Sequence, residues 1–135
     1  FDEIDGFSKF GSYTGNGSAD GPFVYTGFKP RYVLIKRTDT TGDWVVWDTA
    51  RDTYNVAGND LYLQASNGES AGQTRLDFLT NGFKWRTTHA AINASGGTYI
   101  YAAFAEQPFK YSAASAASAA SSFVQAVAFL IGMVF

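Results

Sequence analysis

The sequence predicts an all-β fold, an antiparallel β-sandwich of jelly-roll-like type with about eight strands. Aromatic residues make up 17% of the 135 residues, and 14 glycines are spread among short apolar runs. Aromatic and β-branched residues favour strands, while glycine with Asn, Asp and Pro favours turns. Short apolar runs that alternate with such turns are the pattern of a sandwich or barrel.

Four apolar runs in the first half of the chain predict strands. These runs are Phe7–Thr14, Phe23–Thr26, Tyr32–Arg37 and Trp44–Asp48. The first ends in a turn sequence, Gly15-Asn16-Gly17. The third is apolar on both faces, with Tyr32 and Leu34 on one face and Val33 and Ile35 on the other. We therefore expect it to lie centrally in a sheet.

Four further runs in the second half predict the remaining strands. They are Leu61–Gln64, Arg75–Leu79, Phe83–Arg86 and Thr98–Ala105. Thr80-Asn81-Gly82 lies between the second and third of these, and Asn-Gly is the pair that favours a tight hairpin. In the last run, Tyr99, Tyr101 and Ala103 share one face. Only Thr49–Val56 could hold a short helix, which Gly58 would end.

The distribution of charge divides the chain. All of the 22 charged residues lie at or before Lys110, and the net charge is −2 without a block of like charge, which points away from nucleic acid and from an anionic membrane. We expect residues 1–5 to be the end of a preceding unit or a linker, 6–111 the β-sandwich, and 112–135 a Ser/Ala-rich and apolar assembly segment. The acidic start at Phe1 predicts no signal peptide and a chain taken from something longer. Cysteine is absent, so neither disulfides nor thiolate metal ligands are available.

The C-terminal segment is predicted to be helical and to mediate assembly. Ser112–Ala120 is rich in alanine, and the spacing of the following apolar residues fits a coiled-coil seam. The predicted assembly residues are Phe123, Val127, Leu130 and Val134. Two alternatives stay open. One is a membrane span, although the apolar stretch Phe123–Phe135 is shorter than the roughly 20 residues that a span needs, and the other is an artificial linker.

Residues that carry chemistry are sparse. His89 is the single histidine, and its neighbours suggest a turn or strand end, where a hydrogen-bonded structural role is expected. A glycosidase needs two facing carboxylates, but the aspartates fall in predicted turns without diagnostic spacing. The available ones are Asp39, Asp43, Asp48, Asp52 and Asp60. We therefore expect no catalytic residues, no metal site and no cofactor, with a capsule-degrading hydrolase as the enzymatic rival.

Aromatic side chains give the best binding signal. Rings near strand ends can stack on sugars, and the candidates are Trp44, Trp47, Tyr54, Tyr62 and Trp85. Trp44 and Trp47 have opposite parity on one strand, so one of them should face solvent or a neighbouring subunit. Core packing or subunit contact is the favoured role for this set, and a carbohydrate-binding surface is the alternative.

A short internal similarity suggests tandem copies. Phe1-Asp2-Glu3 resembles Phe104-Ala105-Glu106, and in each case a Phe and a Lys follow after a short gap. One interpretation is that Phe1-Asp2-Glu3 ends a preceding copy of the same module. Coincidence between two short aromatic segments is equally compatible with the sequence.

Longer stretches resemble a domain of uncharacterised function from bacteriophage tail-fibre and related virion proteins. They are Gly6–Ser18, Gly27–Lys36, Gly42-Asp43-Trp44 and Asn93–Glu106. The resemblance covers residues 6–111 and implies a virion structural role, often as tandem copies. It also implies a homo-oligomer, with a trimer favoured, among other virion proteins, with a host-surface glycan as a further possible partner. It supplies no catalytic residues.

Overall fold

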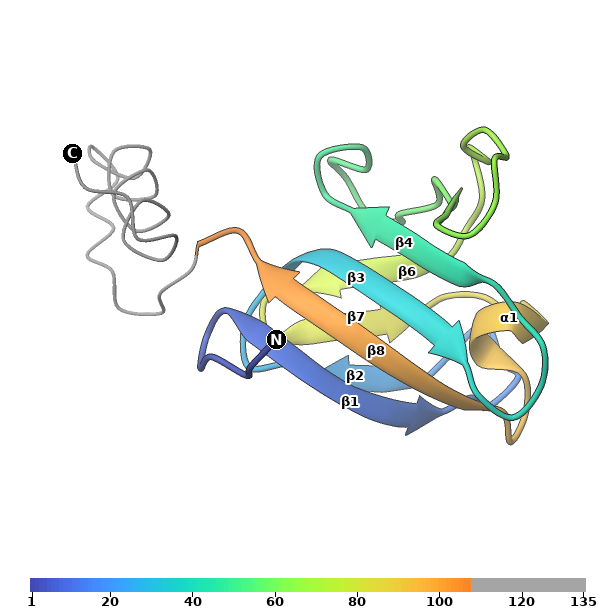
Figure 1. Ribbon diagram of the computed structural model, residues 1–135, viewed down its shortest axis with the longest axis horizontal. Helices are drawn as coiled ribbons and strands as arrows, with labels where there is room; N and C mark the ends of the chain where they lie inside the picture. Colours follow the sequence, from blue (N-terminus) through green and yellow to red (C-terminus); the bar gives the residue numbers. More distant parts are fainter. Residues whose placement is uncertain (108–135) are drawn as a thin grey trace.

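The computed structural model describes residues 1–107 and confirms an all-β fold with eight strands. The strands are β1 (Ser8–Thr14), β2 (Phe23–Tyr25), β3 (Pro30–Arg37), β4 (Trp44–Asp48), β5 (Leu61–Tyr62), β6 (Leu76–Leu79), β7 (Gly82–Trp85) and β8 (Thr98–Ala105). One helical turn, α1 (Ala90–Asn93), precedes β8 at one end of the molecule (Figure 1). All eight predicted strands exist, with ends that differ by a few residues.

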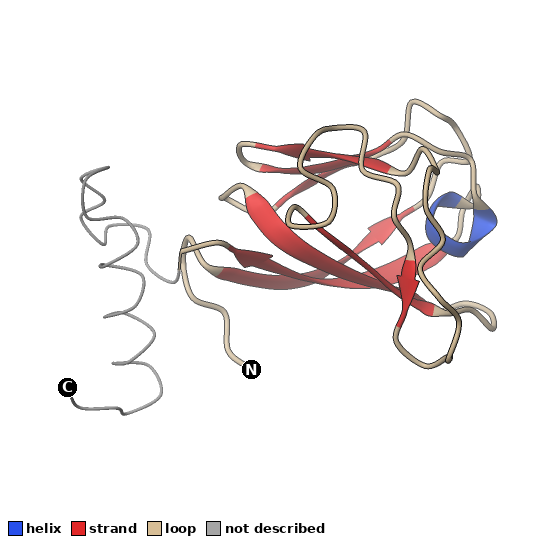
Figure 2. Cartoon of the chain, turned by 90° about the horizontal axis from the view of Figure 1, so that it is seen from above, coloured by secondary structure: helices blue, strands red, loops and turns tan. Residues whose placement is uncertain are grey.

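The strands form two antiparallel sheets that lie one above the other (Figure 2). The five-stranded sheet has the order β1-β8-β3-β4-β5 and the three-stranded sheet the order β2-β7-β6. The pairs β1–β8 and β2–β7 are nested as in a jelly roll, whereas the inner strands pair with their neighbours in sequence, β3 with β4, β4 with β5 and β6 with β7. The third strand lies at the centre of its sheet, as its apolar faces predicted.

The hydrophobic core lies between the two sheets. Val33 and Ile35 of β3 are at most 1% exposed, and Phe83 and Trp85 of β7 are fully buried. The ring of Trp85 packs edge-on against Trp47, with 5.4 Å between ring centroids. Burial of each such side chain contributes roughly 1.5–3 kcal/mol, so the inner faces of β3 and β7 hold the sandwich together.

The β6–β7 hairpin forms where it was predicted, but its turn is displaced by one residue. Leu79 pairs with Gly82, so the two-residue connection is Thr80-Asn81 and Gly82 is already part of β7. A Cβ on Gly82 would lie 2.1 Å from the carbonyl oxygen of Val24. The glycine is therefore required by the close approach of β2.

The helix considered for Thr49–Val56 is absent from the structure. The Asp48 carboxylate accepts hydrogen bonds from the backbone N–H groups of Ala50 and Arg51, which makes a turn after β4. The Asn55 side-chain amide donates to the Phe78 carbonyl and accepts from the Phe78 N–H, which holds Asn55 beside β6. Short polar side chains that bond to the backbone compete with helix formation.

The chain leaves β8 at the end of the sandwich opposite α1 (Figure 1). The expectations for residues 112–135, including a helical segment and assembly through Phe123, Val127, Leu130 and Val134, lie outside the described residues. No helix in the described part of the chain is long and apolar enough to cross a bilayer.

Candidate functional site

An apolar row crosses the side of the five-stranded sheet that faces away from the core. The pairing places Phe10 beside Ala102, Ala102 beside Leu34, Leu34 beside Val46 and Val46 beside Leu61, so that every strand contributes one residue. Paired residues project to the same side of a sheet. Because the inner face is already filled, this row belongs to a second apolar surface.

Trp44 and Ile100 extend the row toward the end that carries α1. They are 38% and 41% exposed, and with Phe10, Leu34 and Ala102 they line a shallow groove of about 570 Å³. We call these five residues the outer face. Lys36 lies between Ile100 and Trp44 in the register, and its ammonium group donates to the Gly42 carbonyl instead of covering the groove. The outer face is therefore open and apolar.

A group of aromatic rings continues this surface at the opposite end. Phe104 packs edge-on against Phe10, Phe7 and Tyr32, with ring centroids 5.8 to 6.0 Å apart. Phe1 also packs on Phe104, at 5.9 Å, although its side chain is fully exposed. Aromatic rings thus cover the sheet near the point where the chain leaves β8.

The structure separates the tryptophans of the predicted binding set. Trp47 and Trp85 are 1% and 0% exposed and lie in the core, which is the core-packing role that the sequence favoured. Trp44 lies on the opposite side of β4 and is exposed, as its parity predicted. Of the three, only Trp44 presents a ring to solvent.

The two tyrosines of that set lie in different surroundings. Tyr54 is 86% exposed on the connection between β4 and β5, and Tyr62 packs partly buried against the core. Tyr62 projects to the inner side, since it pairs with Val45, whereas Trp44 projects to the outer side. The predicted set therefore does not form one aromatic stripe.

Each aspartate considered for catalysis has a partner within the domain. Asp48 accepts from Arg51, and although partial burial raises the pKa of Asp48, the hydrogen bonds from Arg51 bring that pKa below its usual value. The Asp39 carboxylate is paired with Arg37, which lowers the pKa of Asp39. Asp52 accepts from the backbone of Gly58 and Asn59, and Asp43 accepts from Gln64.

Asp60 is buried together with a cation and an indole. Arg75 donates to its carboxylate at 2.7 and 2.9 Å, and the indole N–H of Trp47 donates at 2.8 Å. Asp60 and Arg75 are 2% and 9% exposed. A buried carboxylate is tolerated where charged and polar donors satisfy it. Here the cluster joins the end of the β4–β5 connection to the residue that precedes β6.

His89 has the structural role that the sequence suggested. Its Nδ1 accepts a hydrogen bond from the backbone N–H of Ala91 and so caps α1. The pKa of His89 is lowered, mainly because partial burial disfavours the imidazolium and further because of the positive charge of Arg75. Since the cap requires an unprotonated Nδ1, the neutral ring is the form that suits the fold.

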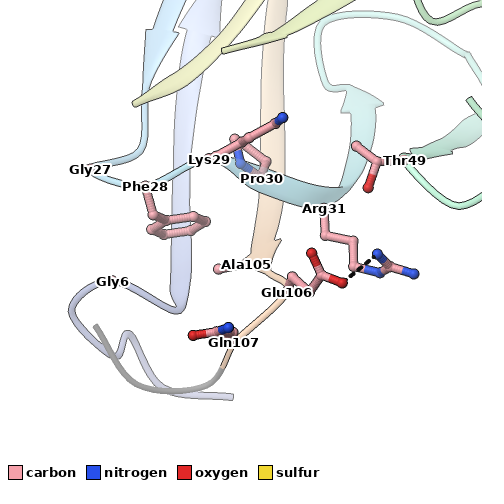
Figure 3. A pocket seen from close by; sticks show the side chains of 10 residues that line it. All are labelled: Gly6, Gly27, Phe28, Lys29, Pro30, Arg31, Thr49, Ala105, Glu106 and Gln107. Atoms are coloured by element: carbon pink, nitrogen blue, oxygen red, sulfur yellow. Dashed lines mark hydrogen bonds and ion pairs between the residues drawn. The ribbon is translucent and has the colours of Figure 1, made fainter. Parts of the chain in front are cut away.

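A polar pocket of about 440 Å³ lies where the chain leaves β8 (Figure 3). Arg31 pairs with Glu106 at 3.0 Å, while Lys29 points away from this pair on the other side of Pro30. Because one cation is neutralised and the other diverges, these groups do not converge on a common ligand. Among residues 1–107, no group of three His, Asp or Glu side chains is placed to hold a metal ion.

The outer face is the surface that sequence reasoning missed. Its signal was present in Tyr32–Arg37, whose apolar residues on both faces predicted a central strand. The same pattern also requires cover on both sides of the sheet. The missing element was the register, which is what joins Phe10, Leu34 and Trp44 into one surface.

Comparison with known proteins gives one match. Residues 1–108 match the model of a protein family described as a domain of unknown function, DUF7483. No curated protein and no solved structure matches the chain.

Proposed function

The chain belongs to the DUF7483 family of domains of unknown function, and we propose that it is a non-enzymatic structural or host-surface-binding module of a phage tail fibre or similar virion appendage. The proposal includes a homo-oligomer, a trimer being favoured, with other virion proteins as neighbours. The observation that carries it is the open apolar outer face. Soluble monomers rarely expose a continuous apolar surface unless it contacts a partner.

The state of the titratable side chains supports a role without catalysis. The aspartates that could serve as a pair of glycosidase carboxylates are held by Arg37, Arg51, Arg75 or backbone donors. His89 is used as a helix cap. Groups that are engaged in holding loops in place are poor candidates for proton transfer to a substrate.

The resemblance to tail-fibre domains supports the virion setting. It runs through the β1 and β3 segments and through the whole of β8, which are neighbours in the five-stranded sheet. The resembling stretches therefore include three adjacent strands of one sheet together with the loops that flank them. Shared strands indicate a shared architecture, and function has to be tested separately.

The direct test is the protein content of particles. Virions from the source that encodes this chain should yield peptides from residues 1–107 by mass spectrometry, and immunogold particles should label a fibre or other appendage. Light scattering of the purified full chain should give a defined oligomer. Absence of the peptides from purified virions that contain their other structural proteins would reject the proposal.

A carbohydrate-binding module is the second candidate, because Trp44 is exposed on a sheet face. An indole face can stack on a sugar ring. On an array of bacterial envelope glycans, Trp44→Ala should then lose the signal, whereas Phe23→Ala, which removes an exposed ring from β2 of the other sheet, should keep it. Absence of a glycan signal from the unaltered chain would remove this candidate.

A further inference from the structure

A further hollow lies where the edge strands β1 and β2 of the two sheets come together. Its volume is about 360 Å³, which is within the range of small-molecule sites. The walls carry Glu3, Asp5 and Lys9 on the β1 side and Tyr25, Thr26 and Gly27 on the β2 side. We call this hollow the side pocket. The residues of the outer face do not line it, so contacts between copies through that face do not need to cover it.

Hydrogen bonds within the chain hold the walls of the side pocket in place. The Ser8 hydroxyl donates to the Asp2 carbonyl at 2.8 Å and accepts from the Ile4 N–H at 2.9 Å, which ties the segment before β1 to that strand. On the other wall, the Thr26 hydroxyl donates to the Phe28 carbonyl at 2.7 Å. Both hydroxyl-bearing residues are buried. A pocket that is already formed costs little to order when a ligand binds.

Tyr25 contributes an exposed aromatic ring to this pocket. It is 64% exposed, and because Val24 before it is buried in the core, alternation along β2 turns the Tyr25 side chain outward. Gly27, whose left-handed backbone (φ 84°) favours glycine, lies next to the ring without a side chain that could cover it. An exposed ring of this kind can stack on the apolar face of a sugar.

The polar groups of the side pocket carry both signs of charge. Lys9 donates to one Glu3 oxygen at 2.9 Å, and the Phe10 N–H donates to the other at 3.1 Å, so the carboxylate is held in one orientation. With Asp5, the lining holds two carboxylates and one ammonium group, an excess of negative charge that disfavours phosphate and other anions. Donors and acceptors beside an exposed ring instead suit a ligand with many hydroxyl groups, which both donate and accept.

We propose that the side pocket binds a neutral saccharide, with the Tyr25 ring stacked on the sugar and with Lys9 and Glu3 bonded to its hydroxyl groups. Gly6 and Gly27 line both the side pocket and the polar pocket of Figure 3, so the two hollows adjoin and offer room for a second sugar unit. The site is separate from Trp44. It requires neither a virion nor an oligomer, so it stands even if the proposed function fails.

Amide NMR spectra of the isotope-labelled full chain test the site directly. The probes are neutral oligosaccharides built from glucose, galactose and their N-acetylamino forms, with inorganic phosphate as the anionic comparison. At least one oligosaccharide should shift the signals of residues 3–9 and 25–27 in a saturable manner, and phosphate should not. Shifts confined to the surroundings of Trp44, saturation by phosphate in place of the saccharides, or no shift with any probe would each overturn the proposal.

Two variants with matched controls test the side chains. Tyr25→Ala should weaken saccharide binding about tenfold, whereas Phe23→Ala, which removes an exposed ring from the same strand but outside the pocket, should leave it unchanged. Lys9→Met should weaken binding several-fold, and Lys84→Met, which breaks the ion pair with Asp20 instead, should not. The amide spectrum of each variant shows whether it is folded. Equal affinities of folded Tyr25→Ala and the unaltered chain would overturn the proposal.

Discussion

The Arg75 guanidinium donates three hydrogen bonds to the Asp60 carboxylate, at 2.7, 2.9 and 3.1 Å. Both residues are buried, with less than a tenth of their surface exposed. The carboxylate also binds the indole of Trp47. Through Trp47 the ion pair is connected to β4, and Arg75 directly precedes β6. The pair joins the two sheets through polar contacts inside an otherwise apolar layer.

Breaking this pair should destabilise the domain strongly. Asp60→Asn or Arg75→Met leaves one buried charge without its counter-charge, a loss of about 3–5 kcal/mol. The loss in the free energy of unfolding is measured by urea denaturation, with tryptophan fluorescence as the signal. Arg86→Met is the matched control, because Arg86 faces Asp77 at 3.6 Å with a 44% exposed side chain and should cost less than about 1 kcal/mol. Similar losses for Arg75→Met and Arg86→Met would contradict this interpretation.

The stability of the domain should fall as the pH is lowered from about 7.5 to 5.5. The pKa of His89 is lowered in the folded protein, so the unfolded chain binds the proton more readily. Stability from the neutral ring is therefore present above the unfolded pKa and is lost as the pH falls toward the folded pKa. His89→Asn keeps a capping side chain without titrating. The slope of unfolding free energy against pH in this window should flatten in the variant, and an unchanged slope would assign it to other groups.

Gly82→Ala should destabilise the domain because there is no room for a methyl group. The added Cβ would lie 2.1 Å from the Val24 carbonyl oxygen and 2.9 Å from the Phe23 ring. Overpacking of this kind typically costs 1–3 kcal/mol, occasionally more, with about 2 kcal/mol as the minimum expected here. Gly68→Ala meets no atom within 4 Å and serves as the control in thermal unfolding. Equal melting temperatures for the two variants would contradict the argument.

Asn93→Asp, which replaces the side-chain amide NH2 group by an oxygen, should destabilise the domain strongly. The buried Asn93 amide nitrogen donates to the carbonyls of Ser18 and Thr87, and its oxygen accepts from the N–H of Asn16. In the variant, a carboxylate oxygen would replace the amide nitrogen. It would have no hydrogen to donate to the two carbonyl oxygens, and this loss should lower the free energy of unfolding by on the order of 3 kcal/mol. The exposed Asn67→Asp is the matched control. Denaturant unfolding at pH 7 compares them, and the difference should shrink at a pH that protonates the new carboxyl group.

The eight strands could be predicted because each has a local signal, either alternating residues or an apolar run between turn residues. The nesting of β1 with β8 could not, because pairing between distant strands depends on register and not on composition. Residues 49–56 were misjudged for a related reason. Asn55 bonds to the backbone of Phe78, 23 residues along the chain, and a partner at that distance is not visible in the local sequence.

The alternation of side chains along a strand correctly placed Trp44 and Trp47 on opposite faces of β4. This inference needs only the sequence of one strand. The same alternation holds for Trp85, which shares one face of β7 with Phe83 while the charged Lys84 lies on the other. It could not find the outer face, whose residues come from strands far apart in the sequence.

The place of β8 between β1 and β3 determines the order in which the protein can fold during its synthesis. Within the described part of the chain, the backbone of β1 pairs along its length only with β8, so β1, which is synthesised before the other seven described strands, has no strand partner until β8 follows. Pairings this distant in sequence form slowly. Insertion of β8 then unites β1 with the rest of the five-stranded sheet in one step, and a nascent chain that stops before Thr98 leaves β1 and β3 as two separate edges.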